Sequence, residues 1–401
     1  MKKVIAVLLM VILLASVFAC AGQGNIVTPS SPPPQTSATG SSPPPTAHEV
    51  TEGFEILQID FGLDVANYDA FSRPAYKFIY ILPGFTPFSQ GMVNMYKLLG
   101  TKLNFTMDAL DANSDNDQFM NNLETCAGQN FDGFIIEGDS TTMDRVLEIA
   151  AEYNITFIPG LSPFIDPSTG IYHMPSVIDD SYARGLACMN YLLDNYESIT
   201  GSGLAWSEIG MITIEWSVIS EFNKRVAGAL DAYKARHPDL VATNYFYLDT
   251  APEPNFVTAE AGYNVTAAIV ASNPQIKGWI VHGVMEDFSD GASRALEDLG
   301  KGSVSLVTSD SINILSGRWD AGYRGCWVGG VDSPQIQFAD SQIQGLIQLV
   351  EGKATPETLW AEFRQPGQNY TVRFLPFSMV TFDNYKAYEA AKERYIATNY
   401  P

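Results

Sequence analysis

The chain has 401 residues, of which 46% are hydrophobic and 17% are charged. This apolar content is enough for a large core and excludes a mostly disordered protein. Lys and Arg number 23 against 45 Asp and Glu, a formal net charge of −22. Because nucleic-acid binding needs clustered cations, the charge excludes that class of function. The length predicts two or three domains, or one domain made of two lobes.

The first segment has the pattern of an export signal. Two lysines precede an apolar run over residues 4–19, which ends at Cys20. The run is shorter than the roughly 20 residues that span a bilayer. Residues 17–20 read Val-Phe-Ala-Cys and resemble a bacterial lipobox, in which the cysteine carries the lipid. We therefore expect a lipoprotein signal peptide over 1–20, with Cys20 lipidated and the protein anchored on the extracytoplasmic face of the cell membrane; a simply cleaved signal is the alternative.

A segment rich in Pro, Ser and Thr follows the apolar run, with triple prolines at 32–34 and 43–45. Such a composition cannot bury enough apolar surface to fold, and its prolines keep the chain extended. We interpret residues 21–74 as a tether and lead-in that holds the body away from the membrane.

The remaining cysteines, Cys126, Cys188 and Cys326, allow at most one disulfide, and their spacing leaves open whether any two pair. No CxxC pattern or Cys/His cluster occurs, and the four histidines are widely scattered. The sequence predicts neither a metal site nor a cofactor.

From residue 75 onward, short apolar segments alternate with longer amphipathic ones. We expect strands at 77–82, 103–110, 133–136, 155–158, 209–214, 242–248, 278–281 and 304–307, and helices at 91–99, 116–127, 142–153, 220–236, 257–271 and 289–299. This alternation predicts an α/β fold with two doubly wound parallel-sheet lobes. Ligands bind at the carboxyl ends of strands in such sheets, and several acidic residues follow the expected strands.

The chain contains no GxSxG, GxxxxGK[ST] or HExxH motif, so it is not expected to be an enzyme. Carboxylates such as Glu137 and Asp310 follow strands, and a sugar-active hydrolase that uses this pair is an alternative. We favour carboxylates that accept hydrogen bonds from a polar ligand.

Several short patterns occur in a fixed order along residues 75–373. They are Pro87-Phe88-Ser89 after the first strand, Phe131-Asp132-Gly133-Phe134-Ile135-Ile136 at the third, Ile178-Asp179-Asp180-Ser181 followed by Gly185, Asn223-Lys224-Arg225 followed by Gly228, and Ser309-Asp310 after a late strand. In this order they resemble the type I periplasmic binding proteins, above all the sugar-binding members that serve ABC importers. The resemblance implies two lobes, joined by three crossings of the chain, that close around a ligand.

The resemblance also implies domain limits. We expect an N-terminal lobe of 75–179 plus 331–368 and a C-terminal lobe of 180–330 plus 369–401. The crossings would then lie near Asp180, Gly330 and Gln368.

The residues expected to bind the ligand follow from the same comparison. Phe88 matches an aromatic residue that stacks on the ligand, and Asp310 matches an aspartate that binds sugar hydroxyls. Where the family carries an Asp-Arg pair after the fourth strand, this chain has Gly-Leu-Ser-Pro at 160–163, and Asn223 replaces a ligand-binding arginine. The full expected set is Phe85, Thr86, Phe88, Glu137, Ser162, Asn223, Phe256, Glu286 and Asp310.

The implied function is extracytoplasmic capture of a small polar ligand, a sugar above all, by a monomer that delivers it to an ABC permease. A ligand sensor for a membrane receptor would use the same site and is a further alternative. Since the Asp-Arg pair is missing, ribose and glucose are expected to bind weakly or not at all.

Overall fold

The computed structural model describes residues 54–113, 115–138, 141–166, 168–217, 219–250 and 258–400. The expected signal peptide over 1–20, the lipid site at Cys20, the first part of the tether and Phe256 lie outside the described residues.

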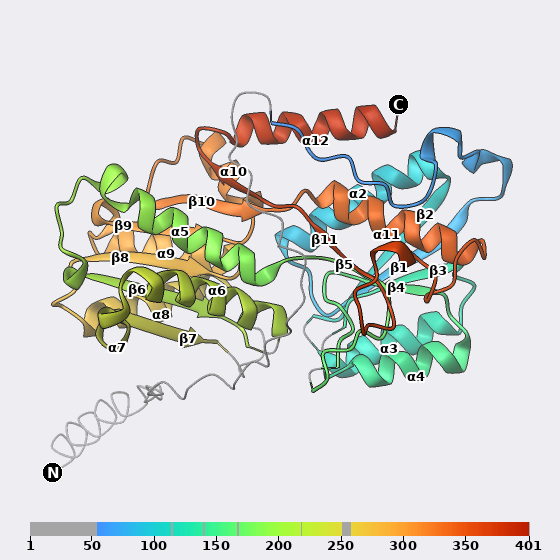
Figure 1. Cartoon of the computed structure of the whole chain (residues 1–401), viewed down its shortest axis with the longest axis horizontal. Coiled ribbons are helices and arrows are strands. Elements are labelled where there is room, and N and C mark those ends of the chain that lie inside the picture. The colour runs from blue at the N-terminus through green and yellow to red at the C-terminus, as the bar shows by residue number, and fades with distance from the viewer. Residues whose placement is uncertain are drawn as a thin grey trace, which may run out of the picture. The chain divides into compact units, whose positions relative to one another are not determined.

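The N-terminal lobe is built on a parallel four-stranded sheet of order β2-β1-β3-β4. Figure 1 shows α2 and α11 on one side of this sheet and α3 and α4 on the other. Its elements are β1 (Tyr76–Leu82), α2 (Pro87–Leu103), β2 (Phe105–Asp111), α3 (Asn116–Ala127), β3 (Gly133–Ile136), α4 (Met143–Tyr153), β4 (Phe157–Pro159) and α11 (Gln335–Val350).

The apolar run of β1 explains why both faces of this sheet are covered. Phe78 and Tyr80 belong to the core that contains α2 and α11, whereas Ile79 and Ile81 belong to the core formed with α3 and α4. Successive side chains of a strand point to opposite faces, so an unbroken apolar segment predicts helices on both sides. The expected doubly wound fold is confirmed here.

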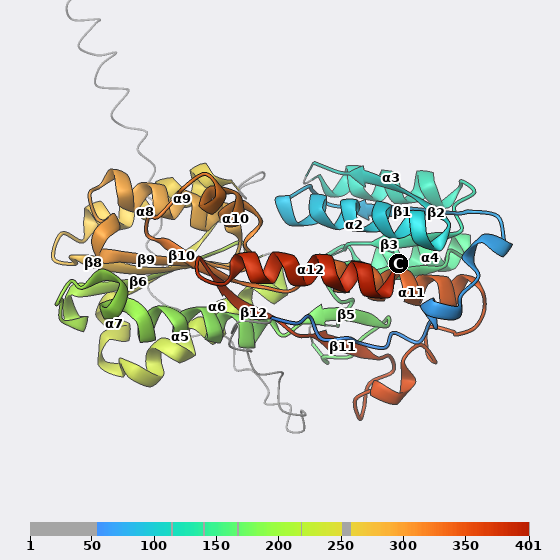
Figure 2. The same cartoon turned by 90° about the horizontal axis from the view of Figure 1, so that it is seen from above.

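The C-terminal lobe contains a six-stranded sheet of order β12-β10-β9-β8-β6-β7, in which only β12 is antiparallel to its neighbour. Figure 2 shows α5 and α6 on one face and α8 and α9 on the other. Its elements are α5 (Ser181–Thr200), β6 (Ile209–Glu215), α6 (Ser220–Arg236), α7 (Val241–Asn244), β7 (Tyr245–Asp249), α8 (Ala259–Ser272), β8 (Gly278–Gly283), α9 (Glu286–Asp298), β9 (Ser305–Ser309), α10 (Asn313–Asp320), β10 (Trp327–Asp332) and β12 (Ser378–Thr381).

The chain passes between the lobes beside a short parallel pair, β5 (Ser176–Asp179) and β11 (Val372–Leu375). The first passage follows β5 and leads into α5, which begins at Ser181. The second follows β10 and not Gly330, because β10 stays paired with β12 as far as Asp332. The third lies between β11 and β12 and not near Gln368, because β11 still pairs with β5.

The last helix, α12 (Tyr385–Asn399), contributes to the cores of both lobes. Tyr388 packs into the core of the C-terminal lobe, and Tyr395 packs into the core beneath α11. A division that gives all of residues 369–401 to the C-terminal lobe is therefore too simple.

Several expected element limits differ from the structure, and two of these differences have a clear physical reason. Residues 242–244 are helical and not extended, so β7 starts only at Tyr245. Helix α2 begins at Pro87, well before residue 91, because the Thr86 hydroxyl accepts a hydrogen bond from the Ser89 backbone and Pro87 suits the first helical position. In the described part of the chain, no helix combines the length and apolar character that crossing a bilayer requires.

Candidate functional site

Most of the expected ligand residues lie directly after parallel strands. In the N-terminal lobe, residues 85–88 follow β1, Glu137 follows β3 and Ser162 follows β4. In the C-terminal lobe, Glu286 follows β8 and Asp310 follows β9. Because the carboxyl ends of parallel strands meet at one edge of a sheet, each lobe gathers its own set at that edge.

The loop after β1 presents one open aromatic ring. Phe85 is 41% exposed. Phe88 lies on α2 with its ring edge-on to Phe338, at 6.0 Å between ring centroids. The Thr86 hydroxyl serves the helix cap and accepts from the Ser89 backbone at 3.1 Å. Phe85 is therefore the ring of this loop that is freer to meet a ligand.

Glu137 is a half-buried carboxylate without a cationic partner among the described residues. It accepts a hydrogen bond from the Tyr80 hydroxyl. Burial raises the pKa of Glu137 to about 7, although the hydrogen bond from Tyr80 acts in the opposite direction. A ligand donor at this carboxylate would supply the stabilisation that the protein itself leaves incomplete.

The segment after β4 passes close to Glu137. A Cβ added at Gly160 would lie 3.0 Å from the Glu137 Cβ, so glycine allows the two backbones to approach. The Gly160 carbonyl accepts from the Gln342 side chain at 2.8 Å, which fixes this segment to α11. Ser162, partly buried, lies two residues further along.

Glu286 is occupied by the start of a helix. Its carboxylate accepts hydrogen bonds from the Ile314 backbone at 2.8 Å and from the Asn313 side chain at 3.2 Å. Only 4% of the residue is exposed, and burial raises the pKa of Glu286 to about 7. The carboxylate caps α10, and a ligand would have to compete with these donors.

Asp310 is enclosed by cations. Its side chain is not exposed, its Oδ2 lies 3.0 Å from Arg225 Nε, and its Oδ1 lies 3.8 Å from Arg184 Nε. Arg225 also donates to the Val284 carbonyl at 3.1 Å. Direct contact between Asp310 and a ligand would require the carboxylate to give up part of this pairing.

Asn223 supports its own loop. Its side-chain amide donates to the Ser217 carbonyl at 3.1 Å and to the Ile219 carbonyl at 3.4 Å. These bonds hold the turn between β6 and α6.

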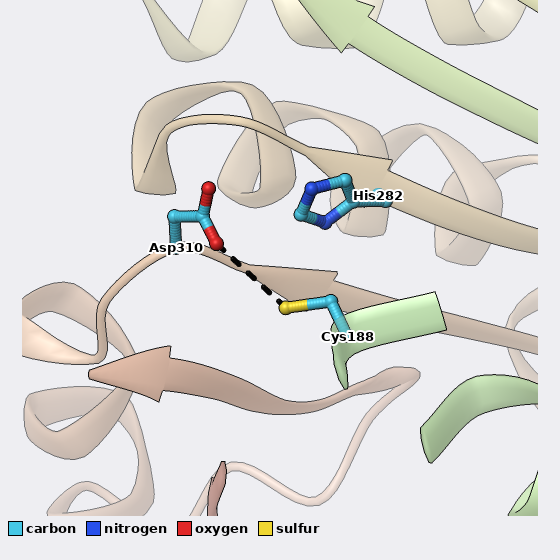
Figure 3. Close-up of side chains that lie close together, drawn as sticks. All are labelled: Cys188, His282 and Asp310. Atoms are coloured by element: carbon cyan, nitrogen blue, oxygen red, sulfur yellow. Dashed lines mark hydrogen bonds between the residues drawn. The ribbon is translucent and has the colours of Figure 1, made fainter. Parts of the chain in front are cut away.

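The structure adds residues that the sequence did not single out. Glu215 ends β6, is 1% exposed and accepts from the Tyr247 hydroxyl. The rule of an acidic residue after a strand would have found it. Cys188 and His282 lie beside Asp310, as Figure 3 shows. Their wide separation in sequence hid this cluster, which only the fold assembles.

The comparisons with known proteins agree with this architecture. Residues 78–240 match the family described as periplasmic binding proteins and the sugar-binding domain of the LacI family. No curated protein sequence matches the chain significantly.

Several solved structures share the fold. An ABC transporter solute-binding protein of Bacillus halodurans C-125 with bound myo-inositol is 17% identical, with a TM-score of 0.59 over 79% of this chain and 98% of its own. A carbohydrate transporter solute-binding protein of Agrobacterium radiobacter in complex with D-arabinose is 17% identical, with a TM-score of 0.60 over 79% and 98%. A periplasmic solute-binding protein of Actinobacillus succinogenes 130z with bound D-allose is 17% identical, with a TM-score of 0.58 over 79% and 100%. At this identity the likeness shows the fold alone.

Proposed function

We propose that this chain is a type I periplasmic binding protein that captures a small sugar or polyol between its two lobes and delivers it to an ABC importer. The observation that carries the proposal is the family match over residues 78–240. It is supported by polar side chains that follow parallel strands in both lobes and by the exposed ring of Phe85 in the N-terminal lobe. The similar structures named above hold inositol, arabinose and allose. A ligand with many hydroxyl groups suits carboxylates and rings at the ends of strands.

The proposed contacts divide between the lobes. From the N-terminal lobe, Phe85 and Phe88 supply apolar rings, while Glu137 and Ser162 exchange hydrogen bonds with hydroxyl groups. In the C-terminal lobe, Asp310 acts mainly by holding Arg225, whose side chain is 14% exposed and lies nearer to solvent. Thr86, Asn223 and Glu286 are kept as further candidate contacts, and Phe256 is kept as a candidate from the sequence alone.

A binding role without catalysis is part of the proposal. Hydrolysis of a glycosidic bond needs a second free carboxylate opposite the acid. Asp310, the expected partner of Glu137, is enclosed and paired with Arg225. Analysis of products after incubation with oligosaccharides separates the two functions, since release of a monosaccharide would favour the hydrolase.

Membrane attachment through Cys20 is proposed from the sequence. The small residue Ala19 precedes Cys20 at the end of the apolar run. The Pro-rich tether that follows Cys20 would hold the folded lobes at a distance from the membrane. The expected result for Cys20→Ser is release from the membrane fraction. Wild-type protein found wholly in the culture supernatant would contradict the anchor.

The ligand is found by calorimetry and thermal shift against pentoses, hexoses, inositols and oligosaccharides, because a bound ligand raises the melting temperature by mass action. For the best ligand, Phe85→Ala and Glu137→Gln are each expected to weaken binding about tenfold or more. Glu152→Gln, an exposed change on the outer helix α4, is the matched control and should bind as wild type does. Unchanged affinity in both site variants would place the ligand elsewhere, and no binding to any carbohydrate would refute the proposed ligand class.

A further inference from the structure

Three side chains that commonly bind metal ions meet beneath helix α5. Cys188 comes from α5, His282 from β8, and Asp310 from the residue after β9. One ligand atom of each lies within 4.8 Å of the others, and all three residues are buried (Figure 3). The Cys188 Sγ and the Asp310 Oδ1 are 3.8 Å apart. We call these residues the α5 trio.

The histidine of the α5 trio lacks hydrogen-bond partners among the described residues. His282 is 0% exposed, and neither of its ring nitrogens has a hydrogen-bond partner among the described residues. A neutral imidazole offers one donor and one acceptor, and buried polar atoms normally find partners. The ring lies beside a thiol and a carboxylate, and a metal ion is a partner that all three could share.

The two oxygens of Asp310 face different neighbours. Oδ2 lies 3.0 Å from Arg225 Nε, whereas Oδ1 lies 3.8 Å from both the Cys188 Sγ and the Arg184 Nε. The carboxylate can therefore bind an ion through Oδ1 and keep its arginine through Oδ2. Carboxylates that ligate metals are usually oriented by a further polar partner, and here the ion pair with Arg225 would orient Asp310.

The net charge of the residues around the α5 trio determines whether a divalent metal ion can bind there. Arg184 and Arg225 are matched by Asp179 and Asp310, so a divalent ion needs two further negative charges. The Cys188 thiolate supplies one. Asp332 is buried near Arg184, and its Oδ1 has no hydrogen-bond partner among the described residues. Burial raises the pKa of Asp332, and its ionised form would supply the other charge. The cluster is then electrically balanced with the ion bound.

We propose that Cys188, His282 and Asp310 form a zinc site within the C-terminal lobe. Zinc accepts sulfur, nitrogen and oxygen ligands at about 2.0–2.3 Å, which puts ligand atoms roughly 3.5 Å apart. The α5 trio therefore needs to contract by about 1 Å. On binding, the Cys188 thiol loses its proton to solvent and a Zn–S bond forms.

A zinc ion at this site would link α5 to two strands of the sheet. Helix α5 is the helix that starts at the first passage between the lobes. Helix α5 begins at Ser181, directly after β5, and the trio fastens it to β8 and to the end of β9. This role is separate from carbohydrate capture, and its test does not depend on the ligand.

The test uses the untagged full-length protein, unfolded with a chelator present and then refolded with or without zinc. Wild type should retain about one zinc per chain and melt several degrees higher than the zinc-free protein. Cys188→Ala and His282→Gln should retain at least tenfold less zinc and lose the shift in melting temperature. Cys126→Ala, which removes a buried thiol in the N-terminal lobe, is the control and should behave as wild type does.

Cobalt(II) gives a second readout that does not depend on how well the variants fold. Refolding the wild type with cobalt should produce a thiolate-to-cobalt charge-transfer band, and the control should retain that band. Wild type that refolds without bound zinc and without this band would overturn the proposal. Equal zinc content in wild type, Cys188→Ala and His282→Gln would also overturn it.

Discussion

Three glutamates at or just after the ends of strands show how the surroundings set the pKa of a carboxyl group. Burial raises the pKa of Glu137, Glu215 and Glu286 to about 7 in each case. Their hydrogen-bond donors are a phenol, a second phenol and the start of α10. These neutral donors only partly replace the water that a carboxylate loses on burial. The folded protein therefore holds these protons at pH values where an unfolded chain has lost them.

The first prediction follows from that difference. A glutamate in an unfolded chain has a pKa of about 4.3, so between roughly pH 4.5 and 7 the folded state binds more protons than the unfolded state. The free energy of unfolding should fall as the pH rises through this window and level off above it. Glu215→Gln, which stays neutral, should lose less stability between pH 5 and pH 8, by on the order of 2 kcal/mol.

Urea unfolding of wild type and Glu215→Gln at several pH values measures this slope. Glu148→Gln is the control, because its side chain is 67% exposed. If Glu215→Gln follows the same pH dependence as wild type, the folded protein does not hold a proton on Glu215.

At the scale of elements, the close packing of α5 against α6 depends on two glycines. A Cβ at Gly185 would lie 1.8 Å from the Arg225 carbonyl oxygen, and a Cβ at Gly228 would lie 2.1 Å from the Tyr182 carbonyl oxygen. Both contacts are with backbone, which cannot move aside cheaply. The two helices therefore touch along their backbones, and this brings Arg225 to its place above Asp310.

The second prediction is that Gly228→Ala destabilises the protein by about 3 kcal/mol, since an overpacked contact must separate the helices. Gly317→Ala in α10 is the matched control, because a Cβ there meets no atom of the described residues within 4 Å. Alanine is the better helix former, so the control should gain about 0.5–1 kcal/mol. Midpoints of urea unfolding measure both. A stable Gly228→Ala would mean that α5 and α6 lie further apart.

The elements also show what the sequence could and could not predict. Strand β1 was predicted because a short, unbroken apolar run is typical of a strand that is buried on both faces. Helices α3 and α6 were predicted with their observed limits because their apolar spacing is helical. Helix α7 was missed because its single turn, with β-branched residues, resembles the start of β7. The order of the predicted strands and helices along the chain thus predicted the fold.

Side-chain partners were harder to predict than elements. Glu286 and Asp310 follow strands as expected, yet α10 and Arg225 occupy their oxygens. Neither partner is a neighbour in sequence, and hydrogen bonds between distant residues leave no periodic pattern. The meeting of Cys188 with His282 was hidden for the same reason.

At the scale of the whole molecule, one buried arginine joins two of the passages between the lobes. The Arg184 guanidinium pairs with Asp179 at the end of β5 and donates to the Ser333 hydroxyl and the Val331 carbonyl, each at 2.8 Å, at the end of β10. Arg184 is 2% exposed. A planar group with several fixed donors can span these acceptors, whereas an ammonium cannot. The arginine therefore sets how the first two crossing segments lie beside each other.

The last prediction concerns removal of this arginine. Among the described residues, Arg184→Ala leaves Arg225 as the one cation beside the buried Asp179, with its Nη2 3.8 Å away. An uncompensated buried charge costs about 3–5 kcal/mol. We expect a loss near the lower end of that range, with Arg184→Lys restoring less than half of it because one ammonium cannot reach both crossing segments. Arg145→Ala, which breaks one exposed ion pair to Glu124 of α3 and one to Glu148 of α4, should cost at most about 1 kcal/mol. Unfolding in urea at pH 7.5 compares the three variants with wild type. An Arg184→Lys variant as stable as wild type would show that charge alone, and not the spanning geometry, is what the two segments require.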